Sequence, residues 1–328
     1  MSRSIRKKSQ QTPVKKYLFR LLFAGLLAAT LSFDIPPEPI SPHARNAPIT
    51  VDGRDDDTVK RLMTAASDSA LTILNGNLWM LPARFSTDKE ERIDRFVTYA
   101  RALMPHVITL QEVWTKNQVK YLKKRFPEYR VHTPGGRGPF NKAGLVTLTR
   151  IPTDSVAFSA FEVSRGASRL ERQAKKGYLI VRLQAGSIKA CIINTHLYAP
   201  TNERERAFAV KQFKTLKRLA PKGNYFIVGD LNLTQKTFER LNDSFFVTER
   251  DTAHTVDAAN IYRSRGANSN KETPGYKVDR LLMPHAHANR FVLRSMLIRE
   301  PVVSDHYLLA YRIERQLVLP QIAERISE

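Results

Sequence analysis

The chain has 328 residues, of which 42% are hydrophobic and 26% charged, a composition that indicates a folded globular protein and excludes a disordered one. Its net charge of +22 and sequence pI of about 10.2 favour polyanionic partners: nucleic acid, anionic lipid surfaces or phosphate-bearing substrates. Cys191 is the only cysteine, which excludes an internal disulfide, and its apolar neighbours indicate a buried, unreactive thiol.

The first 33 residues form a predicted leader. Residues 1–20 are basic and polar, and residues 21–33 contain no charge. That length suits the hydrophobic region of a signal peptide better than a full membrane span, but no clear cleavage site follows, so both a cleaved signal and a retained membrane anchor stay open. We expect an exported or membrane-anchored protein, periplasmic or extracellular if bacterial. Residues 34–70, rich in proline at first, are predicted to be a linker and lead-in.

Hydrophobic periodicity predicts one domain of interleaved strands and helices over residues 71–314, followed by a tail at 315–328. The turn at 184–187, "QAGS", predicts a hairpin, so the sheet should be mixed, with helices on its outer faces. The predicted strands are 71–79, 107–111, 128–132, 143–149, 177–183, 188–195, 224–229, 278–283 and 306–313, and the predicted helices are 89–104, 115–126 with Thr115 as N-cap, and 203–219.

Polar residues follow most of the apolar runs at the point where a strand should end. One such residue is more often a turn former or a satisfied core group than a ligand. A whole set is different, because each buried polar group left unpaired costs about 1–3 kcal/mol. We therefore expect these side chains to gather at one rim of the sheet and to pair with each other, with a cation or with a substrate. They are Asn77, Glu112, His196, Asp230, Asn232, Asp279, Asp305 and His306.

Oxygen ligands without cysteine suit a hard cation. Glu112 with Asn77 therefore predicts a magnesium site, completed by water and a substrate phosphate. In the stretch "FIVGDLNLT", residues 226–234, strand alternation would point Asp230 and Asn232 to the same side. Asp230 would accept a proton from water, and Asn232 would hold that water or the scissile phosphate.

The histidines complete this predicted site. His196 and His306 are candidate donors to phosphate oxygens, where negative charge grows in the transition state. Asp279 is expected to orient an imidazole and to raise its pKa. By contrast His285 and His287, in "HAHAN", have no third ligand in view and are interpreted as part of a polar turn.

The ordered motifs "NLW", "LQEVW", "NTHL", "GDLN", "VDRLL" and "SDH" resemble the endonuclease/exonuclease/phosphatase superfamily over about residues 71–314. This resemblance implies an α/β fold, a four-layer sandwich in which two mixed β-sheets pack together with helices on the outer faces. It also implies a catalytic domain that hydrolyses phosphoesters with Mg²⁺, for which Mn²⁺ could substitute.

The resemblance further implies roles for individual residues. Asn77 and Glu112 are implied to lie on the side of the site that binds the metal ion, and Asp305 is implied to lie close to that ion. His196 is implied as a transition-state stabiliser, Asp230 and Asn232 as the pair that handles the attacking water, and Asp279 with His306 as a pair near the nucleophile. Whether Asp230 or His306 takes the proton stays open; we favour His306 as base or acid, with Asp230 orienting the water.

Within the superfamily, "NLWMLP", "LQEVWTKNQVKYL", "KKGYLIVRL" and "NTHLYA" are similar to the neutral sphingomyelinase branch. That similarity implies that Lys176 lies near the substrate phosphate; the alternative is one more exposed lysine. The apurinic-site endonuclease branch more typically reads "QET", whereas Val113 follows Glu112 here. The loop 133–141, with Arg137 and Phe140, either touches substrate or is a flexible connection.

Three hypotheses follow for function. The first is a Mg²⁺-dependent phosphodiesterase that cleaves a phospholipid headgroup, as a sphingomyelinase or phospholipase C does, at an anionic membrane surface. The second is an exported nonspecific nuclease. The third is a catalytically silent, membrane-tethered binder of polyanions, against which the presence of Glu112, Asp230 and His306 argues. No obligate protein partner is indicated.

Overall fold

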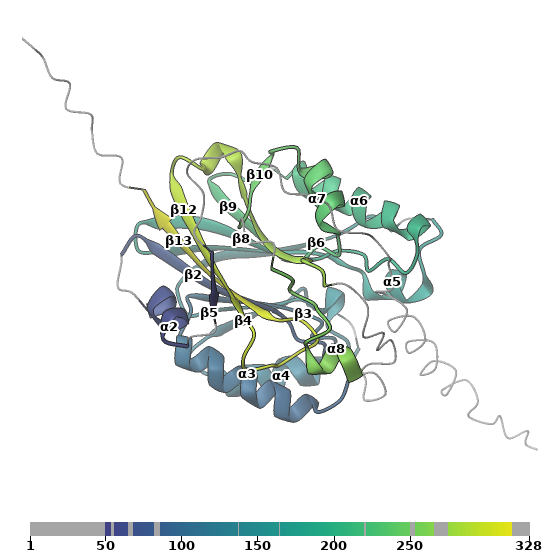
Figure 1. The fold of residues 1–328 in the computed structure, drawn as a ribbon, viewed down its shortest axis with the longest axis horizontal. Helices are drawn as coiled ribbons and strands as arrows, with labels where there is room; N and C mark the ends of the chain where they lie inside the picture. Colours follow the sequence, from purple (N-terminus) through teal and green to yellow (C-terminus); the bar gives the residue numbers. More distant parts are fainter. Residues whose placement is uncertain are drawn as a thin grey trace, which may run out of the picture.

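The structure is a computed structural model that describes residues 50–53, 56–64, 68–81, 86–136, 138–163, 165–219, 221–249, 253–265 and 275–316. Two mixed sheets pack face to face, and helices cover their outer faces, α2, α3 and α4 on one side and α6 and α7 on the other (Figure 1). The predicted four-layer α/β sandwich is confirmed.

The first sheet has seven strands and the second has six. In the first, β2 runs parallel to β3, and in the second, β8 runs parallel to β9. The first sheet is ordered β1 (Thr50–Gly53), β12 (Phe291–Ile298), β13 (Leu308–Arg315), β2 (Ala70–Asn77), β3 (Val107–Gln111), β5 (Val146–Thr149) and β4 (Arg130–His132). The second is ordered β10 (Phe246–Val247), β11 (Asp279–Pro284), β9 (Asn224–Asp230), β8 (Ile188–His196), β7 (Gly177–Ala185) and β6 (Thr153–Ala160).

Helix ends are set by local capping. Thr115 caps α4 as predicted: its hydroxyl accepts from the Gln118 backbone N–H, and the Gln118 side chain accepts from the Thr115 N–H in return. Asn202 and Thr234 cap α6 and α7 in one direction only, their side-chain oxygens accepting from the Glu205 and Thr237 backbone N–H groups. The helices are α2 (Asp56–Thr64), α3 (Lys89–Leu103), α4 (Lys116–Arg125), α5 (Arg169–Ala174), α6 (Glu203–Lys217), α7 (Gln235–Asn242) and α8 (Ile261–Arg265), with short 3₁₀ turns η1 (Lys142–Gly144) and η2 (His285–His287).

Strand alternation builds the layers. On β2, Ile73 faces the second sheet while Leu74 faces the helices, and on β8, Ile192 faces the first sheet while Ile193 faces α6. The core is therefore three stacked apolar layers. Cys191 lies in the layer between the second sheet and helices α6 and α7, buried as predicted, and burial raises the pKa of its thiol.

Most predicted elements are present within one or two residues of their expected ends, including the hairpin between β7 and β8. Only the second half of the predicted strand 143–149 is a strand, since η1 occupies its start. Beyond residue 70, six helices and strands were not predicted: β6, α5, α7, β10, α8 and β12. β1 and α2 lie within the segment expected to be linker and lead-in, and the leader, residues 1–33, lies outside the described residues. Within the described part of the chain, no helix is long and apolar enough to cross a membrane.

Candidate active site

The ends of four strands meet at one rim of the sandwich. Asn77 ends β2 in the first sheet, and Asp230 ends β9 in the second. The Asn77 Nδ2 donates to Glu112 Oε1 and to Asp230 Oδ2, both at 3.2 Å, and so bridges the two sheets. Within the second sheet His196 and Asp279 flank Asp230 as its cross-strand neighbours. The predicted convergence of polar side chains at one rim is present.

The end of β9 explains the sequence "GDLN". Gly229 has a φ of 147°, and a Cβ there would lie 1.9 Å from the Thr195 carbonyl oxygen, so only glycine fits. The strand ends at Asp230, and Asn232 lies beyond it in the left-handed region with a φ of 48°. The strand-alternation argument for Asn232 was therefore wrong. Its N–H donates to Asp230 Oδ1 at 2.9 Å and its Nδ2 to the Leu197 carbonyl at 3.2 Å, so Asn232 orients the Asp230 carboxylate.

Glu112 directly follows β3 and is held in the left-handed region, with a φ of 59°. The side chain is 6% exposed, and its Oε2 is buried without a hydrogen-bond partner among the described residues. Burial and the nearby charge of Asp305 raise the pKa of Glu112 to about 7. A buried carboxylate oxygen left unpaired in a strained backbone is the kind of ligand that a divalent cation needs.

Asp279 and His306 form a buried pair. His306 Nδ1 lies 2.8 Å from Asp279 Oδ2. Burial lowers the pKa of His306, but the Asp279 carboxylate outweighs it and the pKa is raised to about 10. One ligand atom from each of Asp230, Asp279 and His306 lies within 4.8 Å of the others, a second grouping suited to a metal ion, and Asp279 Oδ1 lacks a hydrogen-bond partner among the residues described.

Asp305 is the most exposed of the predicted metal-side residues. Its carboxylate is half-buried and accepts a hydrogen bond from the Ser304 hydroxyl at 3.1 Å. Its charge contributes to the raised pKa values of both Glu112 and His306. Asp305 therefore adds negative charge to the space between them.

Lys176 is buried beside His196. Its Nζ lies 3.2 Å from His196 Nε2, donates to the Leu197 carbonyl at 2.8 Å and pairs with Glu171 at 2.9 Å. Lys176 is 5% exposed, so it is not one more surface lysine. Burial and the Lys176 charge hold the pKa of His196 well below its usual range, and His196 Nε2 also lies 3.5 Å from Asp230 Oδ2.

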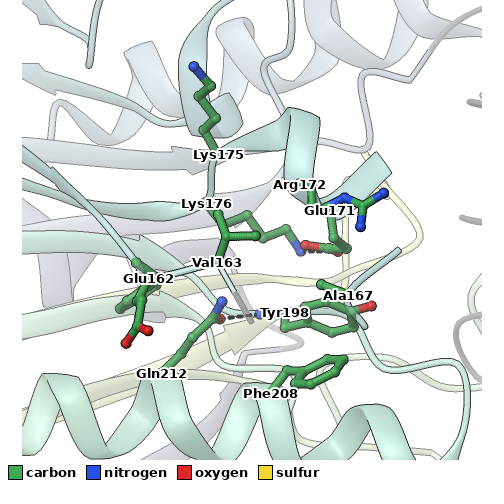
Figure 2. A pocket seen from close by; sticks show the side chains of 11 residues that line it. Glu162, Val163, Ala167, Glu171, Arg172, Lys175, Lys176, Tyr198, Phe208 and Gln212 are labelled. Carbon is green, nitrogen blue, oxygen red and sulfur yellow. Dashed lines mark hydrogen bonds and ion pairs between the residues drawn. The ribbon is translucent and has the colours of Figure 1, made fainter. Parts of the chain in front are cut away.

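A small pocket lies on the other side of Lys176. Figure 2 shows the Lys176–Glu171 pair at its base, the rings of Tyr198 and Phe208 at one wall, and the Gln212 side chain accepting from the Tyr198 backbone N–H at 2.6 Å. The two rings pack edge to face with centroids 5.1 Å apart. Residues of α5 and α6 line this pocket together with the buried lysine.

The structure thus brings together Asn77, Glu112, Lys176, His196, Asp230, Asp279 and His306, with Asp305 and Asn232 at the edge. Sequence reasoning missed Glu171, whose signal is only its position on an unpredicted helix. The other singled-out residues lie elsewhere: His285 and His287 form η2, where His287 packs on Tyr225. Phe140 is 54% exposed and forms an isolated bridge with Thr115, whereas Arg137 lies outside the described residues.

The chain resembles known proteins along most of this region. It is 27% identical over 173 residues to a putative neutral sphingomyelinase of Drosophila melanogaster; the match spans 49% of this chain and 39% of the length of that relative. Among solved structures, SmcL aligns with a TM-score of 0.62 at 16% identity and covers 76% of this chain and 100% of its own. Sphingomyelinase C from Streptomyces griseocarneus aligns with a TM-score of 0.59 at 17% identity, covering 74% and 99%.

A structure of D. rerio TDP2 complexed with a single-strand DNA product aligns equally well, with a TM-score of 0.59 at 20% identity, covering 75% of this chain and 99% of its own. These likenesses in structure concern the fold. The Endonuclease/Exonuclease/phosphatase family matches residues 74–306, from β2 to the Asp279–His306 pair. The chain belongs to this family.

Proposed function

We propose that the protein is a Mg²⁺-dependent phosphodiesterase that hydrolyses a phospholipid headgroup, as a sphingomyelinase or phospholipase C does. One observation carries the proposal: two buried carboxylate oxygens, Glu112 Oε2 and Asp279 Oδ1, lack hydrogen-bond partners among the described residues at the rim where the strand ends converge. Leaving such groups unpaired is costly, so a cation and the oxygens of a substrate are their natural complement.

The donor set fits a hard divalent cation. Glu112 and Asn77 offer oxygens on one side, with Asp305 near them, and no cysteine competes. Asp230, Asp279 and His306 form the second grouping, which suits a further ion. A bound Mg²⁺ would neutralise phosphate charge and favour attack by water.

The chain's own residues then divide the remaining work. Asp230 is fixed by Asn77 and Asn232, so its carboxylate is in place to orient water and to receive a proton. Asp279 holds Nδ1 of His306, which leaves the other ring nitrogen to exchange a proton with substrate. Lys176, close to His196, supplies a positive charge for a phosphate oxygen.

Three observations favour a phospholipid. The curated relative is a putative neutral sphingomyelinase, one solved structure with the same fold is a sphingomyelinase C, and Lys176 is buried at the site. The apolar segment 21–33 supports export or membrane anchoring, which would bring the domain to a lipid surface. The net charge of +22 favours anionic lipid at that surface.

A nuclease is the second candidate. The same positive charge favours nucleic acid, and the D. rerio TDP2 structure with the same fold holds a DNA product. The catalytic residues would serve either substrate, because both contain a phosphodiester. A silent polyanion binder is disfavoured, since the full set of site residues is present and converges.

The deciding experiment measures phosphocholine release from sphingomyelin in mixed micelles by the full chain, with Mg²⁺ and with EDTA. Plasmid nicking and RNA degradation are measured in parallel at low salt. Asp230→Asn tests the site, and Asp154→Asn, at an exposed carboxylate of β6, is the matched control. We expect Mg²⁺-dependent phosphocholine release that only Asp230→Asn abolishes. Nucleic-acid cleavage without phosphocholine release would support the nuclease. The absence of both activities would refute the phosphodiesterase.

A further inference from the structure

Arg92 is a fully buried guanidinium that belongs to no motif. It lies in the first turn of α3, is 0% exposed, and stacks between the rings of Trp79 and Tyr262 at 5.3 and 5.2 Å. Its N–H groups donate to five oxygens, all of them backbone carbonyls except one hydroxyl: the carbonyls of Thr87 at 2.9 Å, Leu78 at 3.0 Å, Val303 at 2.7 Å and Trp79 at 3.3 Å, and Ser86 Oγ at 2.5 Å.

This arrangement is costly for a structural role alone. Arginine has five N–H donors, and every one is used. However, none of the acceptors is a carboxylate, and burying a charge without an ion-pair partner is unfavourable compared with an apolar side chain of the same size. Burial lowers the pKa of Arg92, and the nearby carboxylate of Asp305 opposes that effect. A role in the candidate active site would explain why a charged guanidinium is buried beside it.

On one side, Arg92 fixes the segment that follows β2. It holds the carbonyls of Leu78 and Trp79. The Trp79 N–H donates to Asn77 Oδ1 at 3.1 Å, which sets the orientation of the Asn77 amide. That amide in turn donates to Glu112 and to Asp230. A continuous chain of hydrogen bonds thus joins Arg92 to two carboxylates of the site.

On the other side, Arg92 fixes the segment that precedes β13. The Val303 carbonyl is 211 residues away in the sequence and accepts the shortest of its backbone bonds. Ser304 follows, with its hydroxyl donating to Asp305 Oδ1 at 3.1 Å and accepting from the His306 N–H at 3.3 Å. One guanidinium therefore ties together the two segments that carry the opposite halves of the site.

We propose that Arg92 is a positioning residue, which sets the spacing between the Asn77–Glu112 side and the Asp305–His306 side and so tunes the affinity of the site for a divalent cation. This inference rests on the proposed function only for the identity of the site. It predicts that loss of the Arg92 guanidinium, with its five N–H donors, weakens the affinity for the cation while the protein remains folded.

The test compares the full chain with Arg92→Met and Arg92→Lys, and with Arg101→Met as the matched control. Arg101 lies on the same helix in an exposed pair with Glu128. The dissociation constant for Mn²⁺ is measured by isothermal titration calorimetry, and folding is checked by circular dichroism and thermal unfolding. We expect Arg92→Met to weaken Mn²⁺ binding at least tenfold, Arg92→Lys to restore part of the loss, and Arg101→Met to leave it unchanged.

Unchanged Mn²⁺ affinity in folded Arg92→Met would overturn the inference, as would absence of Mn²⁺ binding in the unaltered protein. If Arg92→Met does not fold, the Mn²⁺ affinity of Arg92→Lys tests the inference instead, because lysine keeps the charge but lacks the planar guanidinium with its five donors. Unchanged affinity in folded Arg92→Lys would then overturn the inference. Because the readout is cation binding, it is independent of the substrate. A protein that binds Mn²⁺ through an Arg92-dependent site but cleaves no phosphodiester would refute the proposed function and leave this inference standing.

Discussion

Two polar networks lie side by side in the sandwich, one inside it and one at its rim. In the interior, Asn75 Oδ1 accepts from Thr109 and Gln111, and Gln111 Nε2 also donates to Asn194 Oδ1. Asn194 Nδ2 donates to two backbone carbonyls on neighbouring strands and to the Thr147 hydroxyl. Every member is neutral, and among the described residues Gln111 Oε1 is the one fully buried side-chain atom of this network that has no hydrogen bond.

The rim network is built one or two residues farther along the same strands. Asn77 follows Asn75 on β2, Glu112 follows Gln111 after β3, and His196 follows Asn194 on β8. Here two of the three side chains, Glu112 and His196, are titratable, and Glu112 Oε2 and His196 Nδ1 lack partners in the described residues. Except at Gln111 Oε1, the interior network is satisfied by the fold itself, whereas the rim network has unpaired titratable groups that a ligand from outside would complete. The difference separates residues that hold the sheets together from residues that we propose act on a substrate.

The sharpest test of this contrast is Asp230→Asn. The amide keeps the size of the side chain but removes the charge and the proton acceptor, so turnover should fall about 1,000-fold, equivalent to about 4 kcal/mol in the barrier. Because Asp230 lies at the rim, the melting temperature should stay the same or rise, since a buried charge is removed. Steady-state rates at saturating Mg²⁺ and thermal unfolding measure the two effects. Near-normal turnover would show that the site assignment is wrong at this residue.

Asn194→Ala is the opposite case. The change removes one hydrogen bond each from Gln111, Thr147 and two backbone carbonyls inside the sandwich, and it opens a cavity. The free energy of unfolding should fall by about 4 kcal/mol, while the chemical step in the protein that remains folded should be little changed. Urea unfolding and the turnover number per folded molecule measure the two quantities. A loss of turnover with no loss of stability would contradict the conclusion that the interior network serves folding and not catalysis.

The same contrast explains what the sequence could predict. Rim residues directly follow apolar strands, so they are easy to recognise as polar positions in the sequence. Their order resembles that of a known family, and this resemblance predicted the four-layer fold. The edge strand β6 was missed because most of its side chains are exposed, which removes the apolar alternation. β12 was missed because it is buried on both faces in its second half and shows no clear period.

Arg92 and Glu171 were missed for a different reason. Each lies on a helix among other charged residues, so nothing local marks it as buried. The partners of Arg92 include Val303, and Glu171 pairs with a lysine whose own burial depends on β7 and β8. Contacts between segments far apart in the chain decide such roles, and a single sequence does not encode them in any local pattern.

Glu112→Gln tests the contrast between the two networks at a single carboxylate, whose Oε2 is buried and unpaired among the described residues. The pKa of Glu112 is raised to about 7, so between about pH 4.5 and pH 7 the unfolded chain releases a proton that the folded chain retains. The metal-free folded state therefore loses up to about 3 kcal/mol of stability as pH rises through that window. Glu112→Gln, which can still accept from Asn77, should escape this loss.

Urea unfolding in EDTA should accordingly find Glu112→Gln more stable than the unaltered protein at pH 7.5, with the difference vanishing near pH 4.5. Adding Mg²⁺ should reverse the order, because only the carboxylate gains a cation, and the variant should need more Mg²⁺ for turnover. Equal stability of the two proteins at both pH values would show that Glu112 is not the strained, unpaired carboxylate of the rim.

The smallest effect is expected at the opposite end of the same strands, where the Nδ1 of a histidine is hydrogen-bonded within the fold. His106 precedes β3, and its Nδ1 accepts from the Thr72 backbone N–H at 3.1 Å, so the ring must be neutral there. Burial and the charges of Arg150 and Arg312 lower the pKa of His106 to about 4. The unfolded chain takes up a proton near pH 6.5, so His106 stabilises the folded state fully above that pH and progressively less as pH falls toward 4.

His106→Asn keeps an acceptor for Thr72 but cannot be protonated. The fall in unfolding free energy between pH 7 and pH 5 should therefore be smaller in this variant than in the unaltered protein, by less than about 2 kcal/mol because solvent screens the partly exposed ring. Urea unfolding at the two pH values measures it, and His285→Asn, at an exposed histidine of η2, is the matched control that should show no such change. An equal fall in all three proteins would show that His106 does not contribute to the acid sensitivity of the fold; the rim groups Glu112, Asp230 and His306 would not explain such a fall, because their raised pKa values favour the folded state as pH decreases.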